Sequence, residues 1–165
     1  GYAPKGENII KHPKIKDDTD TMLCVKKALN LGYKYFEIYG CIGGRLDHTI
    51  ANIQTASFVA ENKGIAVFFD VDNKTALTVI KNDSISFTSD CSGNISVFSV
   101  CDKSVGINET GLLYEVSDGV ITADFPIGVS NEFIGKNASI SVENGKMCII
   151  WDIKTGDFKF GGNYE

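Results

Sequence analysis

The sequence has no apolar run approaching the roughly 20 residues that a helix needs to span a bilayer. It also has no basic run or stripe, and its formal net charge of −5 argues against a nucleic-acid-binding surface. None of its five cysteines forms a Cys-x-x-Cys pair, so neither a zinc site nor a disulfide framework is predicted. We therefore expect a soluble, cytoplasmic protein that binds neither membranes nor nucleic acid.

The composition is that of a folded globular protein. Apolar residues make up 43% of the 165 positions, which is enough for a core that needs no cross-links. Charged residues make up 22%, a fraction too ordinary to indicate disorder. By its length, the chain is predicted to form one domain or two small ones.

The first half of the chain alternates between predicted helices and strands. Residues 17–20 supply N-cap chemistry for a helix that ends before Gly32, and residues 35–39 and 65–71 are apolar runs typical of buried strands. Between these strands, a Gly-rich turn at residues 40–44 precedes a second helix that runs to about residue 63. Its expected apolar face carries Leu46, Ile50 and Ile53. This βαβ order predicts a parallel sheet, as part of a three-layer α/β domain.

From about residue 76 the pattern becomes that of an all-β protein. Short runs rich in Val, Ile, Phe and Thr alternate with turn signals such as Ser92-Gly93-Asn94 and Asn144-Gly145. Such spacing is typical of an antiparallel β-sandwich or jelly roll. Trp151 falls in a strongly apolar strand and is expected in the core. We expect an α/β domain over residues 1–75 and a β-sandwich domain over residues 76–165.

Two segments of the first half carry residue types suited to phosphate. Lys16 and residues 17–20 stand at a helix start, where free N–H groups attract anions and carboxylates can hold Mg²⁺. Ordinary helix capping explains these residues equally well. In the second segment, Gly43, Gly44 and Arg45 follow a strand, at the carboxyl end of the sheet, where ligands bind in α/β proteins. Asp47 in the next helical turn could bind a metal, orient Arg45 or cap the helix.

Taken together, four motifs in order resemble the thiamine pyrophosphokinase family. The first two are Lys-Asp-x-Thr-Asp at residues 16–20 and Gly-Gly-Arg-x-Asp-His at residues 43–48. In the β half, residues 111–114 read Gly-Leu-Leu-Tyr and residues 128–132 read Gly-Val-Ser-Asn-Glu. The resemblance covers essentially the whole chain. It implies an enzyme that transfers pyrophosphate from ATP to the thiamine hydroxyl, with an ATP-binding domain followed by a thiamine-binding domain.

The resemblance also implies roles for individual residues and an oligomeric state. Asp20 and Asp47 would hold Mg²⁺ and act with Arg45 in catalysis. A homodimer with thiamine sites between the subunits is implied, and exposed aromatic residues give it a physical motive. The remaining implied or expected residues are Lys16, Asp17, Thr19, Gly43 and Gly44 at the ATP phosphates, Tyr114, Ser130 and Asn131 at thiamine, and Tyr114, Phe125 and Phe133 as the exposed aromatic surface.

The chain departs from the family pattern in one respect. The family places a metal-binding Gly-Asp-x-Asp-Ser segment upstream of the first helix, and no Asp stands among residues 1–15. Residues 156–159 read Gly-Asp-Phe-Lys, which is only a superficial likeness because Lys159 replaces the second Asp. The chain is therefore expected to be an incomplete enzyme, which could be inactive by itself. The alternative functions are a non-catalytic thiamine- or nucleotide-binding remnant of the family and a β-sandwich interaction module.

Overall fold

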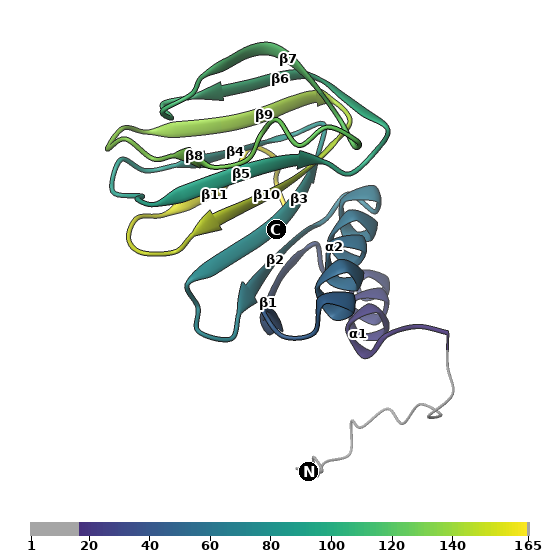
Figure 1. Ribbon diagram of the computed structural model, residues 1–165. Helices are drawn as coiled ribbons and strands as arrows, with labels where there is room; N and C mark the ends of the chain where they lie inside the picture. Colours follow the sequence, from purple (N-terminus) through teal and green to yellow (C-terminus); the bar gives the residue numbers. More distant parts are fainter. Residues whose placement is uncertain (1–16, 165) are drawn as a thin grey trace.

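The computed structural model describes residues 17–164, and Figure 1 shows the arrangement of their helices and strands. The chain begins with α1 (Asp20–Asn30), β1 (Tyr35–Ile42), α2 (Leu46–Glu61) and β2 (Ile65–Asp70). β1 and β2 pair in parallel, as expected for two strands joined by a helix. The remaining elements are β3 (Thr75–Lys81), β4 (Ser84–Phe87), β5 (Asn94–Ser99), β6 (Lys103–Thr110), β7 (Val116–Thr122), β8 (Asn131–Glu132), β9 (Ala138–Asn144), β10 (Lys146–Asp152) and β11 (Phe158–Phe160).

The strands form two sheets. The six-stranded sheet has the order β1-β2-β3-β10-β5-β8, and the five-stranded sheet has the order β11-β4-β9-β6-β7. The prediction of an α/β half followed by an antiparallel β half is confirmed. Within residues 17–164 the parallel pairing is confined to β1 and β2, because β3 returns beside β2 after a turn of only a few residues. β3 also pairs with β10, so the six-stranded sheet continues past the proposed domain boundary at residue 75.

Three layers result, with a hydrophobic core between each adjacent pair. Figure 1 shows both helices on one face of the six-stranded sheet, beside β1, β2 and β3. Phe68 and Leu77 point toward the helices, where Val25 and Val59 meet them. The alternate residues of the same strands point the other way and pack against the five-stranded sheet. Trp151 lies in this second core, as the sequence predicted.

The prediction for the apolar face of α2 was wrong for two of its three residues, since only Ile53 packs against the core. Leu46 and Ile50 are 74% and 51% exposed, whereas Ala56, Val59 and Ala60 are buried against the sheet. Small side chains allow a helix to approach a sheet closely, so the stripe of smaller residues forms the contact. The turn predicted at residues 40–44 was also placed too early, because β1 continues through a bulge to Ile42.

Length and apolar character together decide whether a helix can cross a membrane. Neither helix of residues 17–164 combines the two to the extent that a bilayer span requires.

Candidate functional site

A cavity of 420 Å³ lies at the carboxyl end of β1, where the sequence predicted phosphate binding. Gly44 and Arg45, which join β1 to α2, line it together with Thr21 from the first turn of α1. The start of both helices and the end of a parallel strand therefore meet at one place. Helix N-termini carry unpaired N–H groups and a positive partial charge, which favour an anionic ligand. Gly43 is not among the residues that line the cavity.

Arg45 and Asp47 form a two-pronged ion pair beside this cavity. Arg45 Nε donates to Asp47 Oδ1 at 3.0 Å, and Arg45 Nη2 donates to Asp47 Oδ2 at 2.5 Å. The backbone N–H of His48 also donates to Asp47 Oδ1, at 2.9 Å. These hydrogen bonds, that from Arg45 foremost, hold the pKa of the Asp47 carboxyl below its ordinary value. Of the three roles open to Asp47, the geometry therefore favours orientation of Arg45.

The acidic segment at the start of α1 caps the helix and forms an ion pair. Thr19 is the N-cap, and its Oγ1 accepts a hydrogen bond from the backbone N–H of Met22 at 3.2 Å. Asp18 pairs with Lys26 at 2.8 Å. Asp20 is the first helical residue and directly precedes Thr21 of the cavity wall. Asp17 is exposed, and Lys16 lies outside the described residues.

Only Gly44 and Arg45 of the residues that line the cavity were predicted as site residues, and Asn52 and Tyr39 are notable among the others. Asn52 is buried on α2 and donates to the Cys41 carbonyl at 2.6 Å, which fixes the end of β1. Tyr39 also lines the cavity, and its ring stacks on Phe69 with centroids 4.5 Å apart and planes 9° apart. A polar residue at the fourth position after His48, on the same face of α2, was the available signal for Asn52.

The described residues alone do not form a metal centre. Within residues 17–164, no group of three or more His, Cys, Asp or Glu side chains is arranged to hold a metal ion. Both carboxylate oxygens of Asp47 are engaged by Arg45. A Mg²⁺ ion that keeps several waters and binds substrate phosphates needs only one or two protein carboxylates. Asp20, the other residue predicted to bind metal, stands at the start of α1, directly before Thr21 of the cavity wall.

In the β half, Asn131 is the centre of a buried polar cluster. Its Oδ1 accepts from the backbone N–H groups of Tyr114 and Glu132, both at 2.9 Å. Its Nδ2 donates to the Tyr114 carbonyl at 2.7 Å and to Glu109 Oε2 at 3.1 Å. Burial raises the pKa of the Glu109 carboxyl. Sequence reasoning missed Glu109, although its inward position on β6, two residues after Ile107, was a readable signal.

The other two predicted thiamine residues lie at the surface beside Asn131. Tyr114 is 66% exposed, so its ring is accessible to a ligand. Ser130 adopts a positive φ of 62°, and its backbone N–H donates to Ser96 Oγ on β5 at 3.0 Å. The structure thus brings Tyr114, Ser130 and Asn131 together, with the Tyr114 backbone held by the Asn131 side chain.

Gly111 allows residues 111–114, called the Tyr114 segment below, to cross from one sheet of the sandwich to the other. Its φ is +71°, and a Cβ there would lie 2.0 Å from the Asn137 carbonyl oxygen. The chain then pairs Leu112 with Phe133, which joins the end of β6 to the edge of the other sheet. A side chain at position 111 would therefore be excluded both by conformation and by contact.

We expect Gly111→Ala to lower the free energy of unfolding by about 2 kcal/mol or more, because backbone strain and a backbone clash act together. Gly135→Ala is the matched control, since Gly135 has a similar φ of +73° but an added Cβ would meet no atom within 4 Å. Urea unfolding of both variants measures the difference. Equal losses in the two variants would show that the clash with Asn137 contributes nothing.

The two groups of predicted residues lie far apart within one chain. The cavity is built on β1 and the Asn131 cluster on β8, and these strands are the opposite edges of the six-stranded sheet. Five inter-strand steps of about 4.8 Å separate them by roughly 24 Å. A small molecule cannot bridge that distance to contact both Arg45 and Tyr114 of the same chain.

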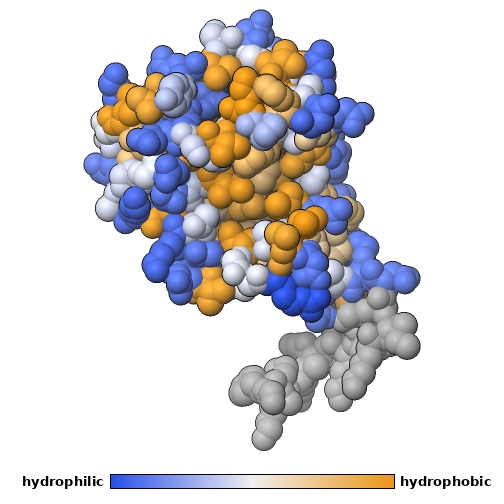
Figure 2. Space-filling view, in the orientation of Figure 1, coloured by the Kyte–Doolittle hydropathy of each residue, from blue (hydrophilic) through white to orange (hydrophobic). Residues whose placement is uncertain are grey.

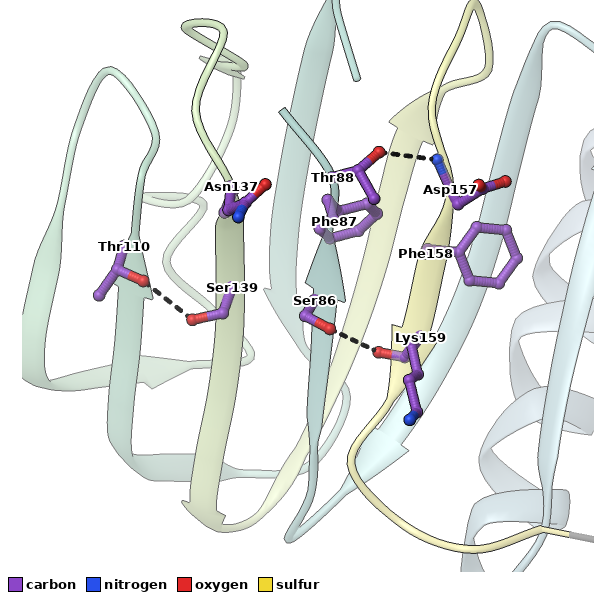
Figure 3. Close-up of a pocket in the computed structure, with 10 residues that line it drawn as sticks. Ser86, Phe87, Thr88, Thr110, Asn137, Ser139, Asp157, Phe158 and Lys159 are labelled. Carbon is purple, nitrogen blue, oxygen red and sulfur yellow. Dashed lines mark hydrogen bonds between the residues drawn. The ribbon is translucent and has the colours of Figure 1, made fainter. Parts of the chain in front are cut away.

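Another cavity, of 510 Å³, lies on the five-stranded sheet and is shown in Figure 3. Its hydroxyl groups bond to neighbouring strands: Thr110 pairs with Ser139 at 2.9 Å, and Ser86 donates to the Lys159 carbonyl at 3.2 Å. Asp157 of the Gly-Asp-Phe-Lys segment lines this cavity. That segment belongs to the β-sandwich, so its likeness to the family's metal-binding motif is not supported by its position.

Comparison with known families gives two matches in succession. The family model of the "Thiamin pyrophosphokinase, catalytic domain" matches residues 1–69, and that of the "Thiamin pyrophosphokinase, vitamin B1 binding domain" matches residues 81–147. A comparison with curated protein sequences gives no match.

Solved structures with similar folds include several thiamin pyrophosphokinases. That from Bacillus subtilis is 22% identical with a TM-score of 0.75, and the match covers 86% of this chain and 66% of that one. That from Geobacillus thermodenitrificans is 23% identical with a TM-score of 0.71, covering 87% and 65%. The yeast structure is 19% identical with a TM-score of 0.58, covering 71% and 39%. The chain therefore spans slightly less than two thirds of the two bacterial structures, with which it shares the fold.

Proposed function

Because the chain belongs to the thiamin pyrophosphokinase family, we propose that it transfers pyrophosphate from ATP to the thiamine hydroxyl, giving thiamine diphosphate and AMP. The observation that carries this proposal is the pairing of an anion-binding cavity at Arg45 with a separate exposed aromatic site at Tyr114. The hydroxyl oxygen forms a bond to the β-phosphorus in line, the bond from that phosphorus to the oxygen bridging to the α-phosphorus breaks, AMP leaves with that oxygen, and the hydroxyl proton passes to water. Positioning and charge neutralisation are sufficient for such a transfer.

ATP is proposed to occupy the cavity at the end of β1. Its phosphates would meet Arg45 and the backbone N–H groups around Gly44, at the positive ends of the helix dipoles. Asp47 takes the Nε–Nη2 edge of the guanidinium and holds the group in a defined orientation before the ligand arrives, while the Nη1–Nη2 edge can match two phosphate oxygens. Thr19 and Asp17 serve the same region through the position of the α1 N-terminus, which Thr19 caps.

Mg²⁺ is proposed as the metal that accompanies ATP. When bound, it neutralises charge on the transferring phosphates and orients them. Asp20 would supply a carboxylate to it, while Asp47 acts mainly through Arg45. A reducing cytoplasm remains the proposed compartment, and the presence of five free cysteines is consistent with it.

Thiamine is proposed to bind at the exposed face of Tyr114. A flat ring accessible to solvent offers stacking for an aromatic ligand and a favourable surface for the thiazolium cation. Ser130 lies in the same surface segment and offers a hydroxyl for a hydrogen bond to the aminopyrimidine. Asn131 supports this site from below by fixing the backbone of Tyr114.

We further propose that the active unit is a homodimer. The roughly 24 Å between β1 and β8 means that one protomer's Arg45 and its partner's Tyr114 must meet around one pair of substrates. The segment between β7 and β8 exposes Phe125, Ile127 and Val129, which a partner would cover. Figure 2 shows hydrophobic side chains gathered across the middle of the face on which Figure 1 places this segment and β5.

One aromatic residue named for this surface does not belong to it. Phe133 is buried in the core and packs edge-to-face on Phe87 with ring centroids 5.1 Å apart. Phe133 directly follows β8, and its backbone forms a β-bridge with that of Leu112. The dimer proposal therefore rests on Tyr114 and the 125–129 segment.

The direct test is to incubate the protein with ATP, Mg²⁺ and thiamine and to identify the products by chromatography. We expect equimolar thiamine diphosphate and AMP, both dependent on thiamine. Thiamine monophosphate with ADP would contradict pyrophosphoryl transfer. Thiamine binding without any turnover would favour the non-catalytic remnant, which nothing in residues 17–164 or in the comparisons favours at present.

We expect Arg45→Lys to weaken ATP binding by about tenfold or more, because a single ammonium cannot replace a fork that spans two phosphate oxygens. Thiamine affinity should change little, because Arg45 is proposed to contact only phosphate, whereas Tyr114 and Ser130 are proposed to contact thiamine. Calorimetric titration with each substrate separately measures both effects. An equal loss of both affinities, or no loss of either, would contradict a phosphate-specific role.

A further inference from the structure

Glu109 occupies an unusual position for an acidic residue. Among the acidic side chains of residues 17–164 it alone is buried, with 3% of its surface exposed. It points from β6 into the space between the two sheets, where its Oε2 accepts the hydrogen bond from Asn131 Nδ2. Burying a carboxyl group is unfavourable unless it serves a hydrogen bond that cannot be made otherwise. The role of Glu109 is therefore inferred from its hydrogen-bond partner, Asn131.

Asn131 has no hydrogen-bonding capacity left for a ligand. A side-chain amide offers two N–H donors and two carbonyl lone pairs. Both donors are used, by Glu109 and the Tyr114 carbonyl, and both lone pairs are used, by the N–H groups of Tyr114 and Glu132. The amide thus clamps the Tyr114 backbone at its N–H and its carbonyl at once. Asn131 acts on thiamine through Tyr114 rather than by touching it.

Glu109 supplies the fourth of the contacts that fix the orientation of this amide. With Nδ2 toward Glu109, every group in the cluster meets a complementary partner. Rotation of the amide by 180° would turn Oδ1 toward the carboxyl oxygen and Nδ2 toward the Tyr114 N–H, so both contacts would become repulsive. The N–H groups of Tyr114 and Glu132 and the Tyr114 carbonyl favour the same orientation, and Glu109 adds to their selection and anchors the amide inside the sandwich.

We propose that Glu109 is a positioning residue of the thiamine site: it orients the Asn131 amide, which in turn holds the Tyr114 segment in place. The inference rests on the proposed function for its ligand, and on the hydrogen-bond geometry for its mechanism. Pre-ordering the segment lowers the entropy that thiamine binding would otherwise have to overcome. Glu109 itself contacts no substrate.

The test compares Glu109→Met, which keeps the length but removes the acceptor, with Glu109→Gln, which keeps an acceptor oxygen for Asn131. In Glu109→Met we expect the Tyr114 and Glu132 amide hydrogens to exchange about tenfold faster or more. Thiamine affinity should fall by a similar factor while ATP affinity stays unchanged. Glu109→Gln should restore both exchange protection and thiamine affinity. Hydrogen exchange by NMR and calorimetric titration provide the readouts.

Glu143→Met is the matched control, because Glu143 is an exposed carboxylate on β9 of the same sheet. Faster exchange spread evenly over the sandwich in Glu109→Met would overturn a specific positioning role, as would unchanged exchange at Tyr114. If Glu109→Met does not fold, Asn131→Ala must produce the same local loosening, and its absence would overturn the proposal. Failure of the wild-type protein to bind thiamine would instead overturn the proposed function and the ligand named here.

Discussion

Mixing Tyr114→Ala protein with Arg45→Ala protein is expected to restore up to about a quarter of wild-type activity from two nearly inactive preparations. The expectation follows from the opposite-edge positions of β1 and β8, which prevent one chain from serving both substrates at one site. When subunits exchange freely, half of the dimers are mixed. Each mixed dimer has one site with both residues intact and one with both replaced, which gives the statistical quarter.

The matched control places both substitutions in one chain. If sites form between subunits, an equal mixture of wild-type protein and the double variant should show about a quarter of the activity of the same total amount of wild-type protein, because both sites of each mixed dimer are then damaged. If each chain carried its own complete site, that mixture would keep half of the activity. The single-variant mixture would then recover nothing. A protein that stays monomeric at micromolar concentration by light scattering and binds thiamine fully would contradict the dimer.

The fold was predictable where local patterns and connection lengths agree. The N-cap chemistry of residues 17–20 placed α1, and two apolar runs joined by a helix placed the parallel pair β1 and β2. The change of pattern near residue 76 was recognised, but the consequence of the short connection at residues 71–74 was not. A connection that short makes β3 antiparallel to β2, so the six-stranded sheet continues from the α/β half into the β half.

The face of α2 was misjudged because hydrophobicity and burial are different quantities. Leu46 and Ile50 have the larger apolar side chains, but they stand in the first turns of the helix and stay exposed. Ala56 and Ala60 are less hydrophobic, yet their size permits the close helix–sheet packing that decides the orientation. Periodicity alone cannot tell which of two helix faces with similar spacing will be buried. Packing against the sheet selected the face with the smaller side chains.

For the candidate site, short-range patterns identified residues but not their partners. Arg45 and Asp47 are two positions apart, and their pairing was among the roles considered for Asp47. Glu109 and Asn131 are 22 positions apart and meet only because the sandwich closes at β8. The roughly 24 Å between the proposed ATP and thiamine residues could not be predicted from the sequence either, since it depends on strand order.

Asp20→Asn and Asp47→Asn are each expected to lower the turnover of the native protein by about tenfold or more, equivalent to about 1.4 kcal/mol. The physical reasons differ. Asp20 is proposed to supply a carboxylate to Mg²⁺, so its replacement removes a metal ligand. Asp47 holds both prongs of the Arg45 guanidinium, so its replacement frees that side chain to adopt other rotamers.

Magnesium titration of the turnover separates these two roles. Asp20→Asn should require a higher Mg²⁺ concentration for half-maximal turnover, whereas Asp47→Asn should keep the wild-type metal dependence and show weaker ATP binding instead. Asp72→Asn is the control, because Asp72 forms only an exposed ion pair with Lys74 at 3.4 Å, in the turn between β2 and β3. Folded variants of Asp20 and Asp47 that both retain wild-type turnover would rule out a role for either carboxylate in the reaction. A shift in metal dependence for Asp47→Asn alone would reverse the assignment: Asp47 would be the metal ligand, and its role in orienting Arg45 would be rejected.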